Sequence, residues 1–143
     1  MSYPIALRDK LYEIFLQAHR LKDGPALFEE RIKPLKRIFS KDRRYLEDRA
    51  RRYLKVIKAR KSAPPGDVAG EVELARLLFK NGLYFDAHEY LETAWKRSSG
   101  SLKLRLQGLI QLAAAMHKRE LDSKARAGVS YLVSKGFEKL SDL

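Results

Sequence analysis

Apolar residues recur every three or four positions through most of the chain, which is the spacing of one face of an α-helix. The first run of this kind consists of Leu7, Leu11, Ile14, Phe15, Ala18 and Leu21. No window alternates apolar and polar residues for long enough to predict a strand, because a half-buried strand needs a period of two. The sequence therefore predicts an all-α fold, a compact helical bundle with about six or seven helices by this periodicity.

Capping residues and prolines delimit two further helices before residue 62. Asp23 can cap the second helix and Pro25 can occupy its first turn, whereas Pro34 is expected to kink or split it. The apolar stripe of this helix consists of Phe28, Ile32, Leu35 and Phe39. Ser40 is expected to cap the third helix. The apolar stripe of the third helix consists of Leu46, Ala50, Tyr53, Leu54 and Ile57.

A pair of prolines divides the chain. Pro64 and Pro65 lie within the segment SAPPGD, and both lack an amide donor and disfavour helix in the residue before them. We therefore predict a basic N-terminal helical segment over residues 1–61, a Pro-rich linker over residues 62–71 and a helical bundle over residues 72–143.

Four helices are predicted after the linker. The first covers residues 72–80 and ends at Asn81 and Gly82, which tolerate the left-handed conformation common after a helix. The second covers residues 84–97. The third, residues 102–118, is apolar almost all round and is expected to be a buried central helix. Asp122 or Ser123 is expected to cap a last helix. The inward residues of this last helix are Val129, Leu132, Val133, Phe137 and Leu140.

Positive charge is concentrated in the N-terminal part of the chain. Residues 1–66 contain 18 Lys and Arg against 8 Asp and Glu, whereas residues 67–143 contain 12 against 10. Residues 31–61 alone contain 14 basic and 3 acidic side chains, which is too unequal for ion pairing to neutralise. This asymmetry favours contact with nucleic acid or another acidic partner. A solvated face, or a surface that docks a partner protein, is the alternative.

The candidate nucleic-acid-binding residues lie on the polar side of the third helix. They are Arg43, Arg44, Arg51, Arg52, Lys55 and Lys58. Tyr45 and Tyr53 lie near one side of the same helix, where they either stack on bases or belong to the core. No helix-turn-helix signature, zinc knuckle or RNA-recognition motif is present, so binding is expected through phosphates and with weak sequence specificity.

Several classes of protein are excluded by what the sequence lacks. It has no cysteine, which removes disulfides, thiol catalysis and thiolate zinc sites. It has no Gly-rich phosphate loop, GxSxG elbow or nucleotide fingerprint, which removes common ATPases, dehydrogenases and α/β-hydrolases, and no cofactor is expected. No apolar run approaches the roughly 18 residues of a membrane span, and the N-terminal MSYPIALRDK is charged where a signal peptide is apolar. We therefore expect a cytoplasmic protein that does not enter membranes.

Two segments resemble a known family. The first is FKNGLYFDAHEYLETAW, in which the matching positions are Phe79, Gly82, Phe85, Asp86, Ala87, His88, Glu89, Leu91, Glu92 and Trp95. The second is the apolar helix LRLQGLIQLAAAMHK, in which they are Gln107, Gly108, Gln111, Ala114 and His117. Together with the following ARAGVSYLVSKGFEKL, this pattern resembles the domain of unknown function 309 family over roughly residues 72–141. Asp86 departs from the pattern, since Glu is at least as usual there. The resemblance implies a compact helical bundle and no established activity.

The shared polar residues form a candidate site. His88, Glu92 and Trp95 lie at positions i, i+4 and i+7, and with Tyr84 and Leu91 they form one stripe that we expect to face the core, with Trp95 largely buried. Buried polar groups need partners, and the central helix offers them. The predicted polar cluster consists of Asp86, His88, Glu92, Trp95, Gln107, Gln111 and His117.

Three interpretations of this cluster remain open. The first is a hydrogen-bonded network that fixes the register of the helices. The second is a metal site formed by His88, Glu92 and His117, although the spacing is not that of HExxH, and no metal ligand is assigned. The third is an acid/base pair of His88 with Glu92 or Glu89 beneath Trp95, which makes His88, Glu89 and Glu92 the candidate catalytic residues. Glu89 projects about 100° from His88 on a helix, so it is expected to face the rim or solvent.

The sequence favours a non-enzymatic binding protein whose basic N-terminal segment contacts nucleic acid or an acidic protein. The alternative is an enzyme, with or without a metal ion, centred on His88 and Glu92. Whether the chain is an enzyme is left open by these patterns.

Overall fold

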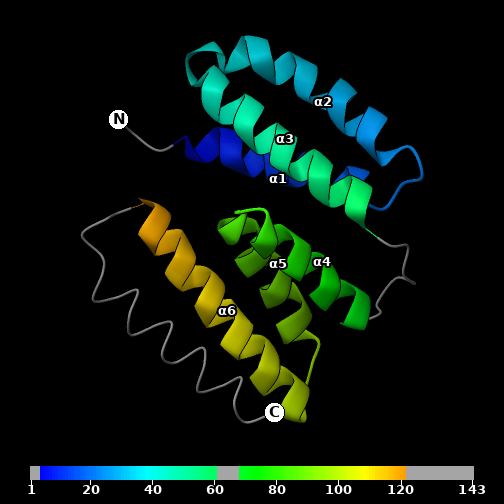
Figure 1. Cartoon of the computed structure of the whole chain (residues 1–143), viewed down its shortest axis with the longest axis vertical. Coiled ribbons are helices and arrows are strands. Elements are labelled where there is room, and N and C mark those ends of the chain that lie inside the picture. Colours follow the sequence, from blue (N-terminus) through cyan, green and yellow to red (C-terminus); the bar gives the residue numbers. More distant parts are fainter. Residues whose placement is uncertain (1–3, 61–67, 122–143) are drawn as a thin grey trace. The chain divides into compact units, whose positions relative to one another are not determined.

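The computed structural model describes residues 4–60 and 68–121 of the chain (Figure 1). The chain divides into two compact units, Met1–Ser62 and Ala63–Leu143, and each is described by itself. The described residues form six α-helices and one short 3-10 helix, and no strand occurs among them. The predicted all-α fold is confirmed. None of the described helices has both the length and the apolar character needed to cross a membrane.

Three helices pack together in the first unit. They are α1 (Ile5–Ala18), α2 (Gly24–Ile38) and α3 (Arg43–Ala59), and each packs against the other two. Each contributes one fully buried aromatic ring to the core: Phe15, Phe28 and Tyr53. The centroid of the Tyr53 ring lies 5.0 Å from that of Phe15 and 5.6 Å from that of Phe28. These three rings join the helices, because aromatic pairs at such distances stabilise a core beyond the area they bury.

Helix α1 ends earlier than its apolar stripe predicts. The helix stops at Ala18, and Leu21 is 53% exposed in the connection that follows, so the expectation that Leu21 faces the core is wrong. The chain turns sharply here because Gly24 packs against the end of α1. A Cβ atom at Gly24 would lie 2.5 Å from the carbonyl oxygen of Ala18, so only glycine allows this approach.

The starts of α2 and α3 differ in detail from the predicted caps. Asp23 precedes α2 and Pro25 lies in its first turn, but the Asp23 side chain makes no capping hydrogen bond. Pro34 lies inside α2 and does not split it. The 3-10 helix η1 spans Ser40–Asp42, so Asp42 rather than Ser40 occupies the cap position of α3.

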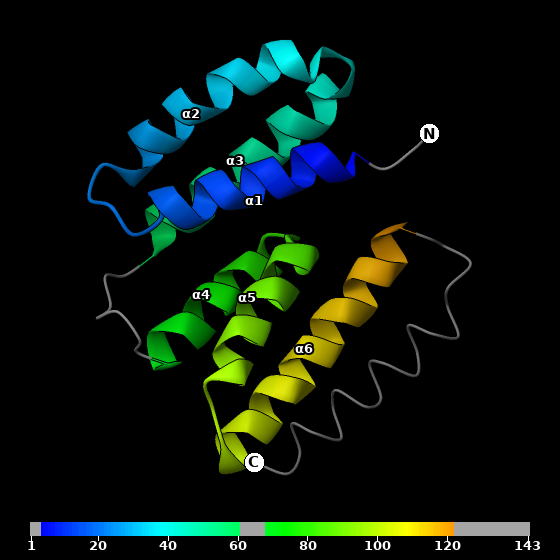
Figure 2. The same cartoon turned by 180° about the vertical axis from the view of Figure 1, so that it is seen from behind.

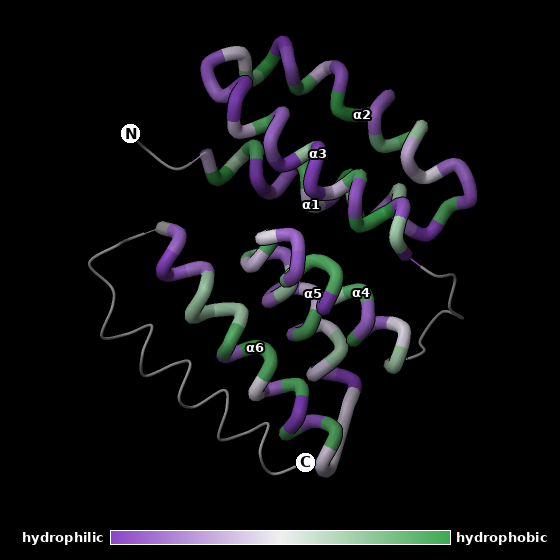
Figure 3. Tube along the Cα trace, in the orientation of Figure 1, coloured by the Kyte–Doolittle hydropathy of each residue, from purple (hydrophilic) through white to green (hydrophobic). Residues whose placement is uncertain are grey.

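Helix α3 has two faces, as predicted. Its buried residues are Leu46, Arg49, Ala50, Tyr53, Val56 and Ile57, whereas Leu54 is only partly buried. Hydrophilic and hydrophobic residues accordingly alternate along α3 in Figure 3. Arg49 is almost fully buried, which is rare for a charged side chain. Its guanidinium carbon lies 5.1 Å from the centroid of the Tyr45 ring, and this cation–π contact offsets part of the cost of burying the charge.

The second unit contains α4 (Val68–Lys80), α5 (Tyr84–Lys96) and α6 (Gly100–Leu121). Helix α4 begins four residues before the predicted start at residue 72. The turn after it is confirmed: Gly82 has a φ of 75°, and the Asn81 side chain donates a hydrogen bond of 2.8 Å to the carbonyl oxygen of Leu77. Among the described helices of this unit, α5 packs against both α4 and α6 (Figure 2). The predicted last helix lies outside the described residues.

Buried His19 should make the stability of the chain depend on pH. It follows α1, and its ring stacks on Phe15 with centroids 5.0 Å apart. Burial, and then the positive charges of Arg60 and Arg20, lower the pKa of His19 from 6.5 to about 4. The unfolded chain therefore binds the proton first as the pH falls, and stability should be lost progressively between pH 6.5 and about 4.

We expect His19→Phe to reduce this loss of stability relative to the unmodified chain. The measurement is urea denaturation followed by far-UV circular dichroism at several pH values across this range. His117→Phe, which removes the partly exposed histidine of α6, is the control and should retain the dependence. Equal pH dependence in the His19→Phe variant and the unmodified chain would contradict the assignment.

Candidate functional site

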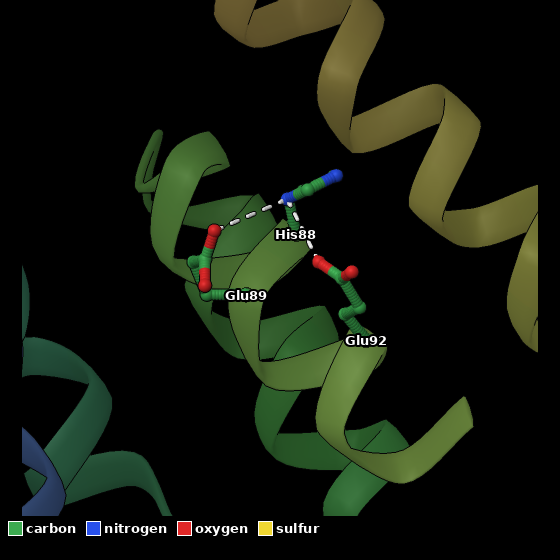
Figure 4. Close-up of side chains that lie close together, drawn as sticks. All are labelled: His88, Glu89 and Glu92. Carbon is green, nitrogen blue, oxygen red and sulfur yellow. Dashed lines mark ion pairs between the residues drawn. The ribbon is translucent and has the colours of Figure 1, made fainter. Parts of the chain in front are cut away.

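Three polar side chains of α5 converge at one point (Figure 4). The Nδ1 atom of His88 lies 3.7 Å from Oε1 of Glu89 and 4.0 Å from Oε2 of Glu92. One potential ligand atom from each residue lies within 4.8 Å of the other two. We call these three residues the His88 site. In Figure 4 the other ring nitrogen of His88 points away from both carboxylates.

Glu89 belongs to this site, where the sequence named it as a possible acid/base partner of His88. A rotation of about 100° between neighbouring helix positions suggested that Glu89 faces the rim or solvent. The structure shows that its side chain extends back toward His88, since a glutamate has enough rotatable bonds to span that separation. Glu92 lies one turn after His88, as its spacing predicts. The His88 side chain is 29% exposed and each glutamate side chain is 41% exposed, so the site is open to solvent.

The core face of α5 differs from the predicted stripe. The buried residues of this helix are Asp86, Ala87, Leu91 and Ala94. The expected inward residues other than Leu91, namely Tyr84, His88, Glu92 and Trp95, are only partly buried. The buried side of α5 is thus displaced by about one position, or 100°, from the side that the stripe of large side chains predicted. Alanines occupy the inward side because Ala87 and Ala94 let the neighbouring helices approach α5 closely.

Asp86 is the one fully buried acidic residue in the described part of the chain. It lies in the first turn of α5, where the helix dipole favours a negative charge. The sequence placed Asp86 in the polar cluster through the family pattern alone. The sequence signal that could have identified Asp86 is its place in the first turn of a predicted helix.

Trp95, which the sequence predicted to be largely buried, lies at the edge of the core of the second unit. It is partly buried and packs against a cluster formed by Ala75, Leu91, Ala94 and Leu106. The Nζ atom of Lys103 lies 4.1 Å from the centroid of its ring, which is a close cation–π contact. Trp95 therefore packs against residues of α4, α5 and α6 and also contacts the ammonium group of Lys103.

The polar residues of α6 do not join the His88 site. His117 packs against Phe85, with ring centroids 5.4 Å apart, and its Nδ1 atom lies 4.0 Å from Oε2 of Glu120. Gln107 and Gln111 are partly buried. Within residues 68–121, no hydrogen bond connects His88 or Glu92 to Gln107, Gln111 or His117. The structure therefore brings together His88, Glu89 and Glu92 and leaves His117, a ligand in one of the three interpretations, outside this group.

The predicted basic residues of the first unit lie on the surface of α3. Arg43, Arg44, Arg51, Lys55 and Lys58 are exposed, and Arg52 is partly exposed. Two carboxylates of the same helix neutralise part of this charge. Glu47 accepts a hydrogen bond of 2.9 Å from Arg43, and Asp48 pairs with Arg51 at 2.6 Å and with Arg52 at 3.1 Å.

The two tyrosines of α3 have different environments. Tyr53 is fully buried between Phe15 and Phe28, so it cannot stack on bases. Tyr45 is partly buried and lies under the guanidinium of Arg49. The surface of α3 therefore offers charge rather than a row of exposed aromatic rings.

A family model described as Domain of unknown function (DUF309) matches residues 72–129. This match confirms the resemblance that the sequence motifs indicated. It includes the His88 site, and it leaves the basic first unit outside. No curated protein and no solved structure matches the chain.

Truncation of Trp95 should test its position at the edge of the core. Because the indole packs against residues of three helices, we expect Trp95→Ala to lower the free energy of unfolding by about 3 kcal/mol, the low end for such truncations. Lys103→Ala removes the cation that lies over the ring and should cost about 0.5–1 kcal/mol. Urea denaturation followed by far-UV circular dichroism measures both. A Trp95→Ala effect no larger than that of Lys103→Ala would contradict the packing role.

Proposed function

We propose that the first unit binds nucleic acid through its backbone phosphates, using one exposed side of α3. The observation behind this proposal is a row of four cations, Arg44, Arg51, Lys55 and Lys58, all exposed. Their spacings of seven, four and three residues place them on the same side of the helix. We call these four residues the α3 basic row.

Most of the row has no local counter-charge. Arg51 pairs with Asp48. Arg44, Lys55 and Lys58 form no ion pair with any residue in the described ranges 4–60 and 68–121. Exposed cations without a nearby carboxylate are available to phosphates, and each phosphate contact releases condensed counterions, which favours binding at low salt.

The dimensions of the row suit a phosphate backbone. Fourteen residues separate its ends, which corresponds to about 21 Å along a helix. A single strand of duplex DNA carries one phosphate about every 3.4 Å of axis, so the row spans several phosphates. Three further exposed cations, Lys36 and Arg37 at the end of α2 and Lys41 in η1, extend the positive charge beyond the start of α3.

The chemistry of the row supports binding without sequence preference. Lys and Arg contacts to phosphates position a protein on nucleic acid but do not distinguish bases. With Tyr53 in the core, α3 provides no row of stacking aromatics. Duplex and single-stranded molecules are therefore both expected to bind, with affinity set by charge density and salt. An acidic protein is the other partner that this surface suits.

Reversal of three unpaired cations tests the proposal. We expect Arg44→Glu, Lys55→Glu and Lys58→Glu together to abolish binding of labelled duplex and single-stranded DNA and RNA at low salt, because the row is then acidic. Fluorescence anisotropy at low and moderate salt is the measurement. Lys80→Glu, Lys96→Glu and Arg105→Glu form the matched control, since these exposed residues of the second unit change the net charge equally.

Two results would count against this proposal. If the unmodified chain binds no nucleic acid at low salt, the acidic protein becomes the preferred partner. If the control variant loses binding as fully as the α3 variant, net charge alone explains the effect and the row has no specific role. Far-UV circular dichroism confirms that both variants remain folded.

Removal of one carboxylate should strengthen binding. Asp48 pairs with both Arg51 and Arg52, so Asp48→Asn removes a phosphate-repelling charge and makes Arg51 available. We expect affinity at low salt to rise about twofold to tenfold, and the gain to shrink as salt screens the charges. Asp9→Asn changes the net charge equally on α1, where Asp9 pairs with Arg8, and should have a smaller effect. Equal gains from the two variants would show that the position of Asp48 is irrelevant.

A further inference from the structure

We propose that the His88 site binds a divalent transition-metal ion of the zinc class. This inference concerns the second unit and does not depend on nucleic-acid binding by the first. It rests on three donor atoms of suitable type, Nδ1 of His88 and one carboxylate oxygen each of Glu89 and Glu92, gathered within 4.8 Å of one another.

The distances between these atoms suit a shared ion better than direct contact. The separations of 3.7 Å and 4.0 Å from His88 to the two carboxylates are too long for hydrogen bonds. Two ligands that each lie about 2.1 Å from a zinc ion at a tetrahedral angle are about 3.4 Å apart. The two His88 separations of 3.7 Å and 4.0 Å exceed this value by less than 1 Å, and the separation of the two carboxylate oxygens is at most 4.8 Å. Small rotations of the two partly exposed glutamates would close that difference.

The charge of the site favours a cation. Glu89 and Glu92 lie three residues apart on one helix face, where two carboxylates repel each other. Their only ion-pair partner in the described part of the chain is the His88 imidazole. Two other acidic residues of this unit have cationic partners: Glu71 pairs with Arg97, and Glu73 with Arg76. A bound dication would neutralise the two carboxylates that lack such a partner.

The donor set indicates the class of ion. An imidazole nitrogen with two carboxylate oxygens suits zinc, nickel, iron or manganese, whereas magnesium and calcium prefer oxygen ligands alone. All three donors come from one helix and are partly exposed, so water or a substrate can occupy the remaining positions around the ion. Such an arrangement corresponds to an open metal site rather than a closed structural one.

A second pair of a histidine and a glutamate in the same unit provides an internal comparison. His117 and Glu120 on α6 lie 4.0 Å apart, the same distance as His88 and Glu92, and also within one turn of a helix. No third His or acidic residue joins them among the described residues. If three converging ligands are the requirement, variants of this pair should leave metal binding unchanged.

The test uses the full chain, freed of any affinity tag, treated with chelator and desalted. Isothermal titration with zinc, nickel, manganese and magnesium chlorides should show one site per chain. Zinc and nickel should bind more tightly than manganese, following the usual order for nitrogen and oxygen ligands, and magnesium weakly or not at all. Absence of zinc binding, or magnesium binding as tight as zinc binding, would overturn the proposal.

Variants then assign the ligands. His88→Ala, Glu89→Gln and Glu92→Gln should each weaken zinc binding about tenfold or more, since loss of even an outer-shell partner has that effect. The two glutamine variants preserve side-chain size, and circular dichroism verifies folding. His117→Ala and Glu120→Gln should retain the affinity of the unmodified chain. Unchanged zinc binding by His88→Ala, or an equal loss in His117→Ala, would refute the assignment of the site.

Discussion

The packing of small side chains on one side of α5 determines what the rest of the second unit presents to solvent. Leu91 and Ala94 of α5 meet Ala75 of α4 and Leu106 of α6 in one buried cluster. Because α4 and α6 both pack against α5, its rotation is fixed by the side that allows the closest approach. That rotation leaves His88, Glu89 and Glu92 partly exposed. The geometry of the His88 site is therefore a consequence of helix packing.

A comparable constraint acts in the first unit, where Tyr53 lies against both Phe15 and Phe28. This contact fixes the rotation of α3, since a fully buried ring in the middle of the helix allows only one face inward. The opposite face then holds the α3 basic row at regular intervals. Position on the helix, and not charge, determines which side chains of α3 are buried. Arg49 shows this, because it lies on the inward side and contacts Tyr45.

The sequence predicted the helices well and the orientation of α5 poorly, for physical reasons. Periodicity and turn residues located each of the described α-helices, because an apolar stripe and the break that ends it are local properties of the sequence. On α3 the buried side is also the side with large apolar residues. On α5 the large residues Tyr84 and Trp95 lie on one side and the alanines on another. Which of these sides faces the core depends on the packing of the neighbouring helices. Glu89 was a candidate partner of His88, but the helical projection alone directed it toward the rim or solvent, because side-chain flexibility does not appear in such a projection.

The two proposals depend on forces of different range, so they are physically separable. Phosphate binding by exposed cations acts through screened charge, which at 0.1 M salt extends about 10 Å. Metal coordination at His88 acts through bonds of about 2 Å, which salt affects far less. The family match covers residues 72–129, so it includes the candidate metal ligands but none of the α3 basic row. If the metal site is a property of this family, it should occur in chains without a basic first unit. Nucleic-acid binding would then be an addition made by residues 4–60 of this chain.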